Sequence, residues 1–337
     1  MGDFTISGTA EFEKRLSFAL QQIAHDCRSS FPTKDCALVL GGGYGRGEGG
    51  VLETELGEAF FNDLDLVWVH RGWRLSSQER RELEKLARRH QNRLGIEVDI
   101  YPLAQSRIAY LPSTLFWYEF SHGHQVISGS PSVMQPLGSR SLQSVSANEW
   151  GRMLMNRSAG VVFARWVLDG NPPLLARHEE PRAFIWRQMM KAWLAMGDIW
   201  LARQELYHPL ASERQKRLQA VRAPAGLSAE YAQALEFKLR PSLPSPTMDL
   251  GGALSRLAER LHPALERCPA SPRCSVIGLY ATIRYLPIRK WLMARPDIYP
   301  RERVRSALIA ELKGDYQERL RLVGDTRLFE RLWALHG

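Results

Sequence analysis

Apolar side chains follow two kinds of spacing along the first 130 residues of the chain. Helical periodicity predicts amphipathic helices, whereas short uninterrupted apolar runs bounded by polar or glycine residues predict buried strands. Helices are expected over residues 11–27, 76–94 and 113–120, and strands over residues 36–40, 64–70, 96–101 and 126–127, with Pro102 ending the third strand. This mixture indicates an α+β domain with a small mixed β-sheet.

The pattern changes at about residue 146, after which only helical spacings remain. The proline-rich segment 240–246 cannot lie inside a helix and is interpreted as a linker. Helices are expected over residues 150–168, 181–207, 212–221, 228–239, 249–267, 276–294 and 302–322, followed by a short C-terminal helix. We therefore predict two domains, residues 1–145 carrying the sheet and residues 146–337 forming an all-α helical bundle.

A glycine-rich turn, GGGYGRGE, follows the first predicted strand at residues 41–48. Because glycine lacks a Cβ, the backbone N–H groups of such a turn can approach phosphate oxygens closely. Gly42 and Gly43 are therefore candidates for holding phosphate, and Arg46 could supply a fixed positive charge to a triphosphate. Turns of this kind are also common as plain connections between strand and helix, so the neighbouring residues decide their meaning.

Two carboxylates stand two positions apart at the second predicted strand. Alternate residues of a strand point to the same face, so Asp63 and Asp65 converge and would repel each other without a cation. Mg²⁺ prefers carboxylates, water and substrate phosphates as ligands. If the third strand is a neighbour, Asp99 can complete a site for two Mg²⁺ ions or accept a proton. The plainer alternative is that Asp63 caps a turn after Asn62 and that Asp65 faces solvent.

The turn followed by Asp63-Leu64-Asp65 resembles the corresponding motifs of the polymerase-β-like nucleotidyltransferase superfamily. The amino-acid sequence of the turn is most similar to that of uridylyltransferases that modify a nitrogen-signalling protein. The resemblance covers about residues 36–130. It implies that Gly42, Gly43 and Arg46 hold a nucleoside triphosphate, and that the Asp pair and Asp99 bind Mg²⁺.

The chain departs from that family in its segment 49–62, which is longer than the usual gap and rich in glutamate. It also shows no His-Asp hydrolase motif and no regulatory tail. The helical half looks like the bundle that closes over the nucleotide in smaller antibiotic- and RNA-modifying members. Lys191 in this half could reach the triphosphate, although a solvated helix charge explains it equally well.

The overall composition favours anionic partners, since 45 Lys and Arg residues face 36 Asp and Glu residues, a formal net charge of +9. No apolar stretch approaches the roughly 18 residues of a membrane span, and no secretory signal is recognised, so a cytoplasmic protein without a membrane partner is expected. The four cysteines, at positions 27, 36, 268 and 274, lack zinc-ligand spacing and are expected to be free thiols.

Together these features predict a Mg²⁺-dependent nucleotidyltransferase that moves a nucleoside monophosphate from a nucleoside triphosphate, with ATP favoured, to an acceptor hydroxyl and releases pyrophosphate. The acceptor is left open among a small molecule, a protein and an RNA 3′ end. Two other functions stay open, an RNA- or tRNA-modifying transferase or toxin and a non-catalytic nucleotide-binding module. The first predicts a basic stripe continuous with the metal site, and the second predicts nucleotide binding without pyrophosphate release.

Overall fold

The computed structural model describes residues 2–173, 176, 179–267 and 300–315. Its contacts divide the chain into two compact units, the first comprising Met1–Val145, Glu205–Arg222 and Leu235–Ser242 and the second comprising the rest. The boundary after Val145 agrees with the change in sequence pattern at about residue 146. The two later segments, Glu205–Arg222 and Leu235–Ser242, nevertheless belong to the first unit. The expected helices over 276–294 and at the C-terminus, the end of the helix expected over 302–322, and the last two cysteines lie outside the described residues.

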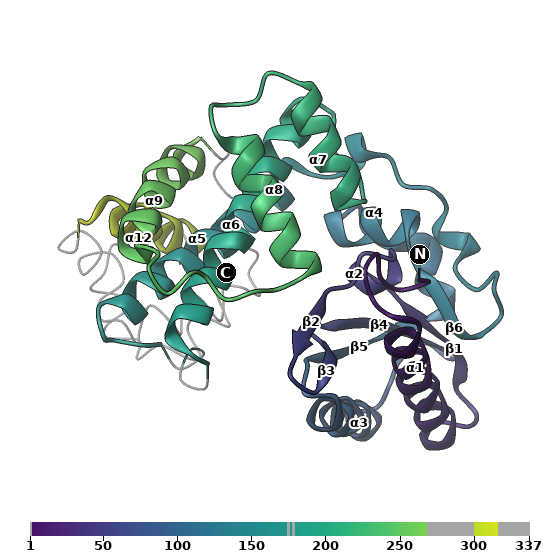
Figure 1. Cartoon of the computed structure of the whole chain (residues 1–337). Coiled ribbons are helices and arrows are strands. Elements are labelled where there is room, and N and C mark those ends of the chain that lie inside the picture. Colours follow the sequence, from purple (N-terminus) through teal and green to yellow (C-terminus); the bar gives the residue numbers. More distant parts are fainter. Residues whose placement is uncertain (1, 174–175, 177–178, 268–299, 316–337) are drawn as a thin grey trace, which may run out of the picture. The chain divides into compact units, whose positions relative to one another are not determined.

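A four-stranded mixed sheet forms the centre of the first unit, with the strand order β5-β4-β1-β6 (Figure 1). β1 pairs antiparallel with both β4 and β6, whereas β4 pairs parallel with β5. The bounds are Asp35–Leu40 for β1, Leu64–His70 for β4, Val98–Ala104 for β5 and Gln125–Gly129 for β6. The expected α+β class with a small mixed sheet is confirmed.

The segment 49–62, for which no element was expected, forms a separate two-stranded hairpin. Its strands are β2 (Val51–Thr54) and β3 (Gly57–Phe60), paired antiparallel with Glu53 opposite Glu58. Gly57 has φ +106° at the turn, a conformation that favours glycine.

Helices cover both faces of the sheet. α1 (Ala10–Ser30) and α3 (Ser77–Leu94) lie on the same face (Figure 1), where Leu64, Leu66 and Trp68 of β4 share a buried core with them. The opposite face, with Val67 and Val69 of β4, packs against α4 and two short 3₁₀ helices. Their bounds are Leu115–His122 for α4, Gln105–Tyr110 for η1 and Gln135–Leu137 for η2; a third 3₁₀ helix, η3, spans Leu142–Ser144. Because side chains alternate along a strand, Asp65 belongs to the α4 face.

Most predicted boundaries are confirmed within two or three residues, because local signals set them. α3 begins with a capping box between Ser76 and Glu79, and it ends at Gly95, which has φ +71°. Two predicted ends are wrong: the helix expected over residues 181–207 ends at Arg203, and β5 continues through Pro102 to Ala104. A proline is tolerated at this place because β5 is an edge strand, so its missing N–H removes no ladder hydrogen bond.

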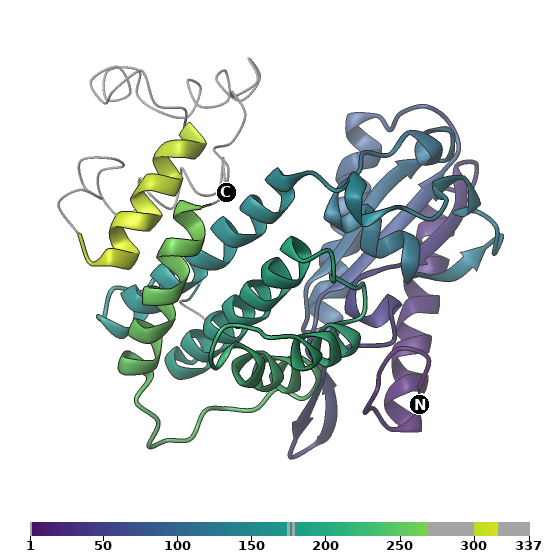
Figure 2. The same cartoon turned by 90° about the horizontal axis from the view of Figure 1, so that it is seen from above.

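The second unit is helical in its described part (Figure 2), as expected. α5 packs against α6 and α9, and α12 packs against α9 and α5. The bounds are Ala147–Leu168 for α5, Pro181–Arg203 for α6, Leu250–Glu266 for α9 and Pro300–Lys313 for α12. α8 (Leu227–Leu239) begins in this unit, where the Tyr231 hydroxyl donates to Asp198 of α6 at 2.9 Å. Segment 240–246 contains no helix, as expected of a linker.

Candidate functional site

The glycine turn after β1 is folded directly against Asp65. The Gly41 N–H donates to the Asp65 carbonyl at 2.8 Å, and α2 (Gly42–Gly45) follows as a single helical turn. Gly42 has φ +62°, and a Cβ placed on it would lie 2.1 Å from Asp65 Oδ2. The sequence therefore needs glycine at residue 42, both for its backbone conformation and for the close approach of the carboxylate.

The structure brings Asp65 and Asp99 together. They are register partners in the parallel pairing of β4 with β5, so their side chains leave the same face of the sheet on adjacent strands. Asp63 precedes β4 and acts on both of them electrostatically. Burial raises the pKa of Asp65 to about 7, and Asp63 adds to this rise while Arg46 opposes it. Burial and Asp63 also raise the pKa of Asp99.

These carboxylates have the chemistry of a cation site. Within the described residues, no hydrogen bond or ion pair satisfies the side chains of Asp63, Asp65 and Asp99, and their mutual repulsion is what a divalent ion would relieve. In their present positions, however, no three His, Cys, Asp or Glu side chains of the described chain are arranged to hold a metal ion. The donor set thus fits Mg²⁺, and enclosing an ion requires side-chain movement.

Arg46 lies beside the trio, and its guanidinium is already paired. Its Nη1 is 3.1 Å from Glu119 Oε2 of α4, and only 8% of the Arg46 side chain is exposed. Arg214 approaches the other oxygen of Glu119 at 3.3 Å, and the Tyr207 hydroxyl also donates to that oxygen. Although burial acts in the opposite direction, Arg46 and Arg214 hold the pKa of Glu119 below its usual value. The Nε of Arg46 is buried without a hydrogen-bond partner in the described structure, so one donor remains available.

Glu48, the last residue of the turn, anchors a distant helix. Its two carboxylate oxygens accept the backbone N–H groups of Ala211 at 2.7 Å and Ser212 at 2.9 Å. These residues begin α7 (Ala211–Ala220), whose own N-cap residue provides no side-chain hydrogen bond. Glu48 is 2% exposed and therefore caps α7 from within the core of the first unit.

Lys238, near the end of α8, completes this charged cluster and was not foreseen from the sequence. Burial lowers its pKa to about 8, and Arg46 and Arg214 lower it further, while Glu48 and Glu119 act in the opposite direction. Lys238 makes no hydrogen bond or ion pair within the described residues. Its position in an ordinary amphipathic helix gives no local signal of this environment, since that environment comes from segments far away in the chain.

The cluster of Arg46, Arg214, Lys238, Glu48 and Glu119 has three positive and two negative groups. It lies next to the backbone N–H groups of Gly42, Gly43 and Tyr44, none of which donates a hydrogen bond in the described structure. A net positive cluster beside unused backbone donors can bind an anion. Lys191 belongs to α6 of the second unit and is not part of the site described here; its phosphate contact stays a prediction.

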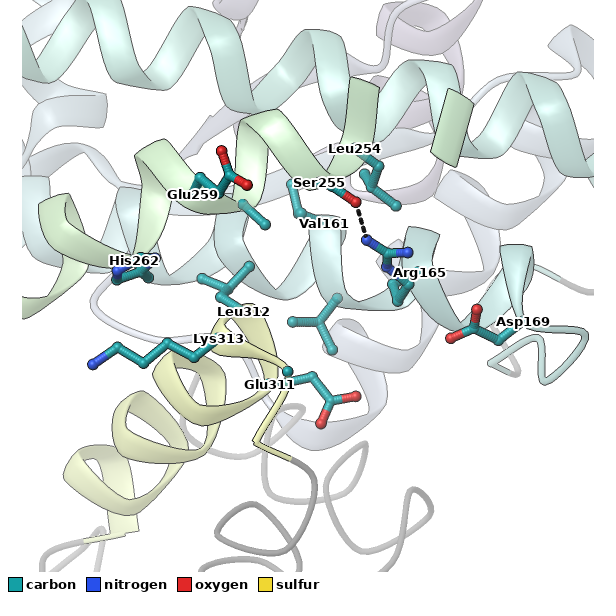
Figure 3. A pocket seen from close by; sticks show the side chains of 13 residues that line it. Val161, Arg165, Asp169, Leu254, Ser255, Glu259, His262, Glu311, Leu312 and Lys313 are labelled. Atoms are coloured by element: carbon teal, nitrogen blue, oxygen red, sulfur yellow. Dashed lines mark hydrogen bonds between the residues drawn. The ribbon is translucent and has the colours of Figure 1, made fainter. Parts of the chain in front are cut away.

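The second unit contains a separate cavity of about 620 Å³ among α5, α9 and α12 (Figure 3). Two of its basic side chains already have partners. Arg165 donates to Ser255 Oγ at 2.7 Å, as the dashed line in Figure 3 marks, and Lys313 pairs with Glu266 at 2.5 Å. As described, the carboxylates that line this cavity, those of Asp169, Glu259 and Glu311, do not form a group that could hold a metal ion.

Compared with models of known families and with curated proteins, the chain matches no family model and no curated sequence. Across the part of the chain that the structure describes, no helix combines the length and apolar character needed to cross a lipid bilayer. The function is therefore inferred from the site itself.

Proposed function

We propose that this protein is a Mg²⁺-dependent nucleotidyltransferase whose first unit carries the catalytic site and whose second unit is a helical bundle. The proposal rests chiefly on one observation. Asp65 and Asp99 are register partners on adjacent strands, and the Asp65 carboxylate rests on the glycine turn at Gly42. These carboxylates and a glycine turn of the size that holds phosphate therefore lie next to each other on the sheet.

The residues of the chain have distinct tasks in this reaction. The N–H groups of Gly42, Gly43 and Tyr44 bind phosphate oxygens, and the positive cluster around Arg46 and Lys238 attracts the triphosphate. Asp63, Asp65 and Asp99 would hold Mg²⁺, which neutralises phosphate charge and polarises the α-phosphate. Catalysis then comes from positioning and electrostatic stabilisation, because no side chain of the site forms a covalent intermediate.

Bond formation and bond cleavage occur at the α-phosphorus. The acceptor hydroxyl oxygen bonds to this phosphorus and its proton passes to solvent, while the bond from the phosphorus to the bridging oxygen breaks and pyrophosphate leaves with the electron pair. ATP is the favoured donor. Lys191 of the second unit is retained as a proposed contact for the triphosphate, and a cytoplasmic location as a proposed setting.

The test is label transfer from each nucleoside triphosphate. The purified chain is incubated with an α-labelled triphosphate, Mg²⁺ and a cell extract, and both pyrophosphate release and the labelled fraction are measured. The Asp63→Ala, Asp65→Ala variant is expected to lose at least about 10²-fold in rate. The matched control is Glu53→Ala, Glu55→Ala, which removes two carboxylates at the same spacing from the hairpin.

The proposal fails if the aspartate variant transfers label as fast as the wild type. Tight triphosphate binding with no pyrophosphate release from any of the four nucleotides would instead identify a non-catalytic nucleotide-binding module.

A further inference from the structure

A groove of about 340 Å³ runs along the outer edge of the sheet in the first unit, between β5 and α3. β5 is the terminal strand of the sheet order, and in the described structure it pairs only with β4. The groove is lined on one side by Arg80 and Arg88 of α3 and on the other by residues 98–100 and Pro102 of β5. A helix and an unpaired strand edge therefore form its two walls.

The main chain of β5 presents hydrogen-bonding groups to this groove. The Leu64 N–H of β4 donates to the Glu97 carbonyl, so the backbone groups of Glu97 and Asp99 are directed to β4. The N–H and C=O groups of Val98 and Ile100 consequently point outward, and Pro102 adds a carbonyl without an N–H. Such an edge can pair with one further extended segment.

The charges and the floor of the groove restrict what that segment is. Arg80 and Arg88 are exposed and form no ion pair within the described chain, so they favour acidic side chains; Glu84 on the helix wall and Asp99 on the strand wall are the acidic residues among the lining. The floor is apolar, with Leu83 and Ala87 facing Val98 and Ile100. No aromatic side chain stands among the described lining residues, and this lack disfavours single-stranded nucleic acid, which binds by base stacking.

We propose that an extended acidic segment of a partner protein adds to the outer edge of β5 and presents its hydroxyl side chains as acceptors. Side chains of an added strand alternate between the two faces of the sheet. Those on the α3 face meet Arg80 and Arg88, whereas those on the other face lie about 5 Å from Asp99, as cross-strand neighbours do. The recognised pattern is therefore a serine, threonine or tyrosine flanked on both sides by acidic residues.

The acceptor part of this inference rests on the proposed function, whereas the docking part does not. In the transfer step the peptide hydroxyl oxygen bonds to the α-phosphorus of the nucleotide. The bond between this phosphorus and the bridging oxygen breaks, pyrophosphate leaves with the electron pair, and the hydroxyl proton passes to solvent. The product is a nucleotidylated protein side chain.

Docking is tested by fluorescence polarisation of the full chain with a fluorescein-labelled peptide, EYESEYE. We expect it to bind at least about tenfold more tightly than the lysine counterpart KYKSKYK, and to lose at least about fivefold in the Arg80→Glu, Arg88→Glu variant. The matched control is Arg81→Glu, Arg93→Glu, which reverses two exposed charges on the same helix outside the groove. A peptide with N-methylated backbone amides is expected to bind more weakly, because it cannot pair with the strand edge.

Docking is overturned if EYESEYE fails to bind at about 1 mM, or if both charge-reversal variants bind it as the wild type does. It is also overturned if a single-stranded RNA oligonucleotide binds and only that binding is lost in Arg80→Glu, Arg88→Glu.

Label transfer separates the two parts. Binding of the peptide together with an α-phosphate label on its tyrosine or serine supports both. Binding without label from any of the four triphosphates refutes the acceptor role and leaves docking intact. Label on another acceptor, with no peptide binding, supports the proposed transferase and removes the docking inference.

Discussion

Asp65 of β4 and Asp99 of β5 are partners in a parallel register, so two acidic side chains leave the same face of the sheet on adjacent strands. Parallel pairing aligns them because both strands run in the same direction with no offset between these residues. Burial, the nearby Asp63 and, to a smaller extent, Asp99 penalise the charged form of the half-buried Asp65 at neutral pH. This penalty yields two predictions, one about the metal-free protein and one about its response to Mg²⁺.

Asp65→Asn is expected to stabilise the metal-free protein at pH 8. The folded pKa of Asp65, about 7, is higher than the ordinary value of 3.8, so the native state binds more protons than the unfolded state between these pH values. Its contribution to stability therefore falls as the pH rises from about 4 to 7 and stays low above that. We expect a gain of about 2 kcal/mol in urea unfolding at pH 8, and little gain at pH 4. A variant that is less stable than the wild type at pH 8 would contradict this account.

Mg²⁺ is expected to raise the melting temperature of the wild type at pH 8. The ion binds the folded carboxylate trio and has no comparable site in the unfolded chain, so binding stabilises the native state. Differential scanning fluorimetry with increasing Mg²⁺ measures the shift. We expect the shift to disappear in Asp65→Asn and to persist in the hairpin control Glu53→Gln, Glu55→Gln. An equal shift in both variants would place the ion elsewhere.

Gly42→Ala is expected to destabilise the fold by about 2 kcal/mol or more and to abolish transfer. A Cβ at residue 42 meets Asp65 Oδ2 at 2.1 Å in addition to the unfavourable φ of +62°. Gly57→Ala is the control for backbone strain alone, because φ there is +106° and nothing lies within 4 Å of the added atom. In a double-mutant cycle, Asp65→Ala should reduce the cost of Gly42→Ala; an unchanged cost would show that the contact is not responsible.

Glu48→Ala is expected to cost about 2 kcal/mol, because it leaves two N–H groups at the start of α7, one buried and one partly buried, without acceptors. Hydrogen exchange should show faster exchange at Ala211 and Ser212, while amides of α1 are affected much less. Glu58→Ala, which removes an exposed hydrogen-bonded carboxylate from β3, is the control. Unchanged protection of the α7 amides would contradict the capping role.

Lys238→Met is expected to stabilise the protein at pH 7. The folded pKa of Lys238, about 8, is lower than the ordinary 10.5, so the unfolded state binds more protons between these values and stability rises with pH there. The advantage of the variant is therefore largest below pH 8 and disappears toward pH 10.5, at most about 3 kcal/mol in urea unfolding. The variant should also bind triphosphate more weakly. A Lys238→Met variant that is less stable than the wild type at pH 7 would show that Glu48 and Glu119 stabilise the Lys238 charge more than we infer.

The sequence was sufficient for features that depend on local signals. The capping residue Ser76, the terminating Gly95 and the uninterrupted apolar run of β4 each mark an element boundary directly, and the strand spacing of Asp63 and Asp65 indicates their convergence. The sequence predicted that Asp99 lies near Asp65 only if their strands are neighbours. The sheet order is what shows that β4 and β5 are adjacent.

Long-range partners could not be predicted in the same way. Arg46 was expected to meet phosphate, but its pairing with Glu119 depends on where α4 packs, and no periodicity encodes that distance. The capping of α7 by Glu48 joins residues 163 positions apart. The hairpin of segment 49–62 was missed because its strands are only four residues long and contain glutamate, so they lack an uninterrupted apolar run.

The anchoring of α7 by Glu48 also has a consequence for biosynthesis. The ribosome must release the chain beyond residue 212 before this turn acquires its partners, and beyond residue 238 before Lys238 arrives. During synthesis, the Glu48 carboxylate consequently has no partner and the core of the N-terminal part is uncovered while some 160 further residues are translated. A fragment that ends at residue 145, after the sheet domain, should therefore be prone to aggregation. We also expect chaperones to bind the chain during its synthesis.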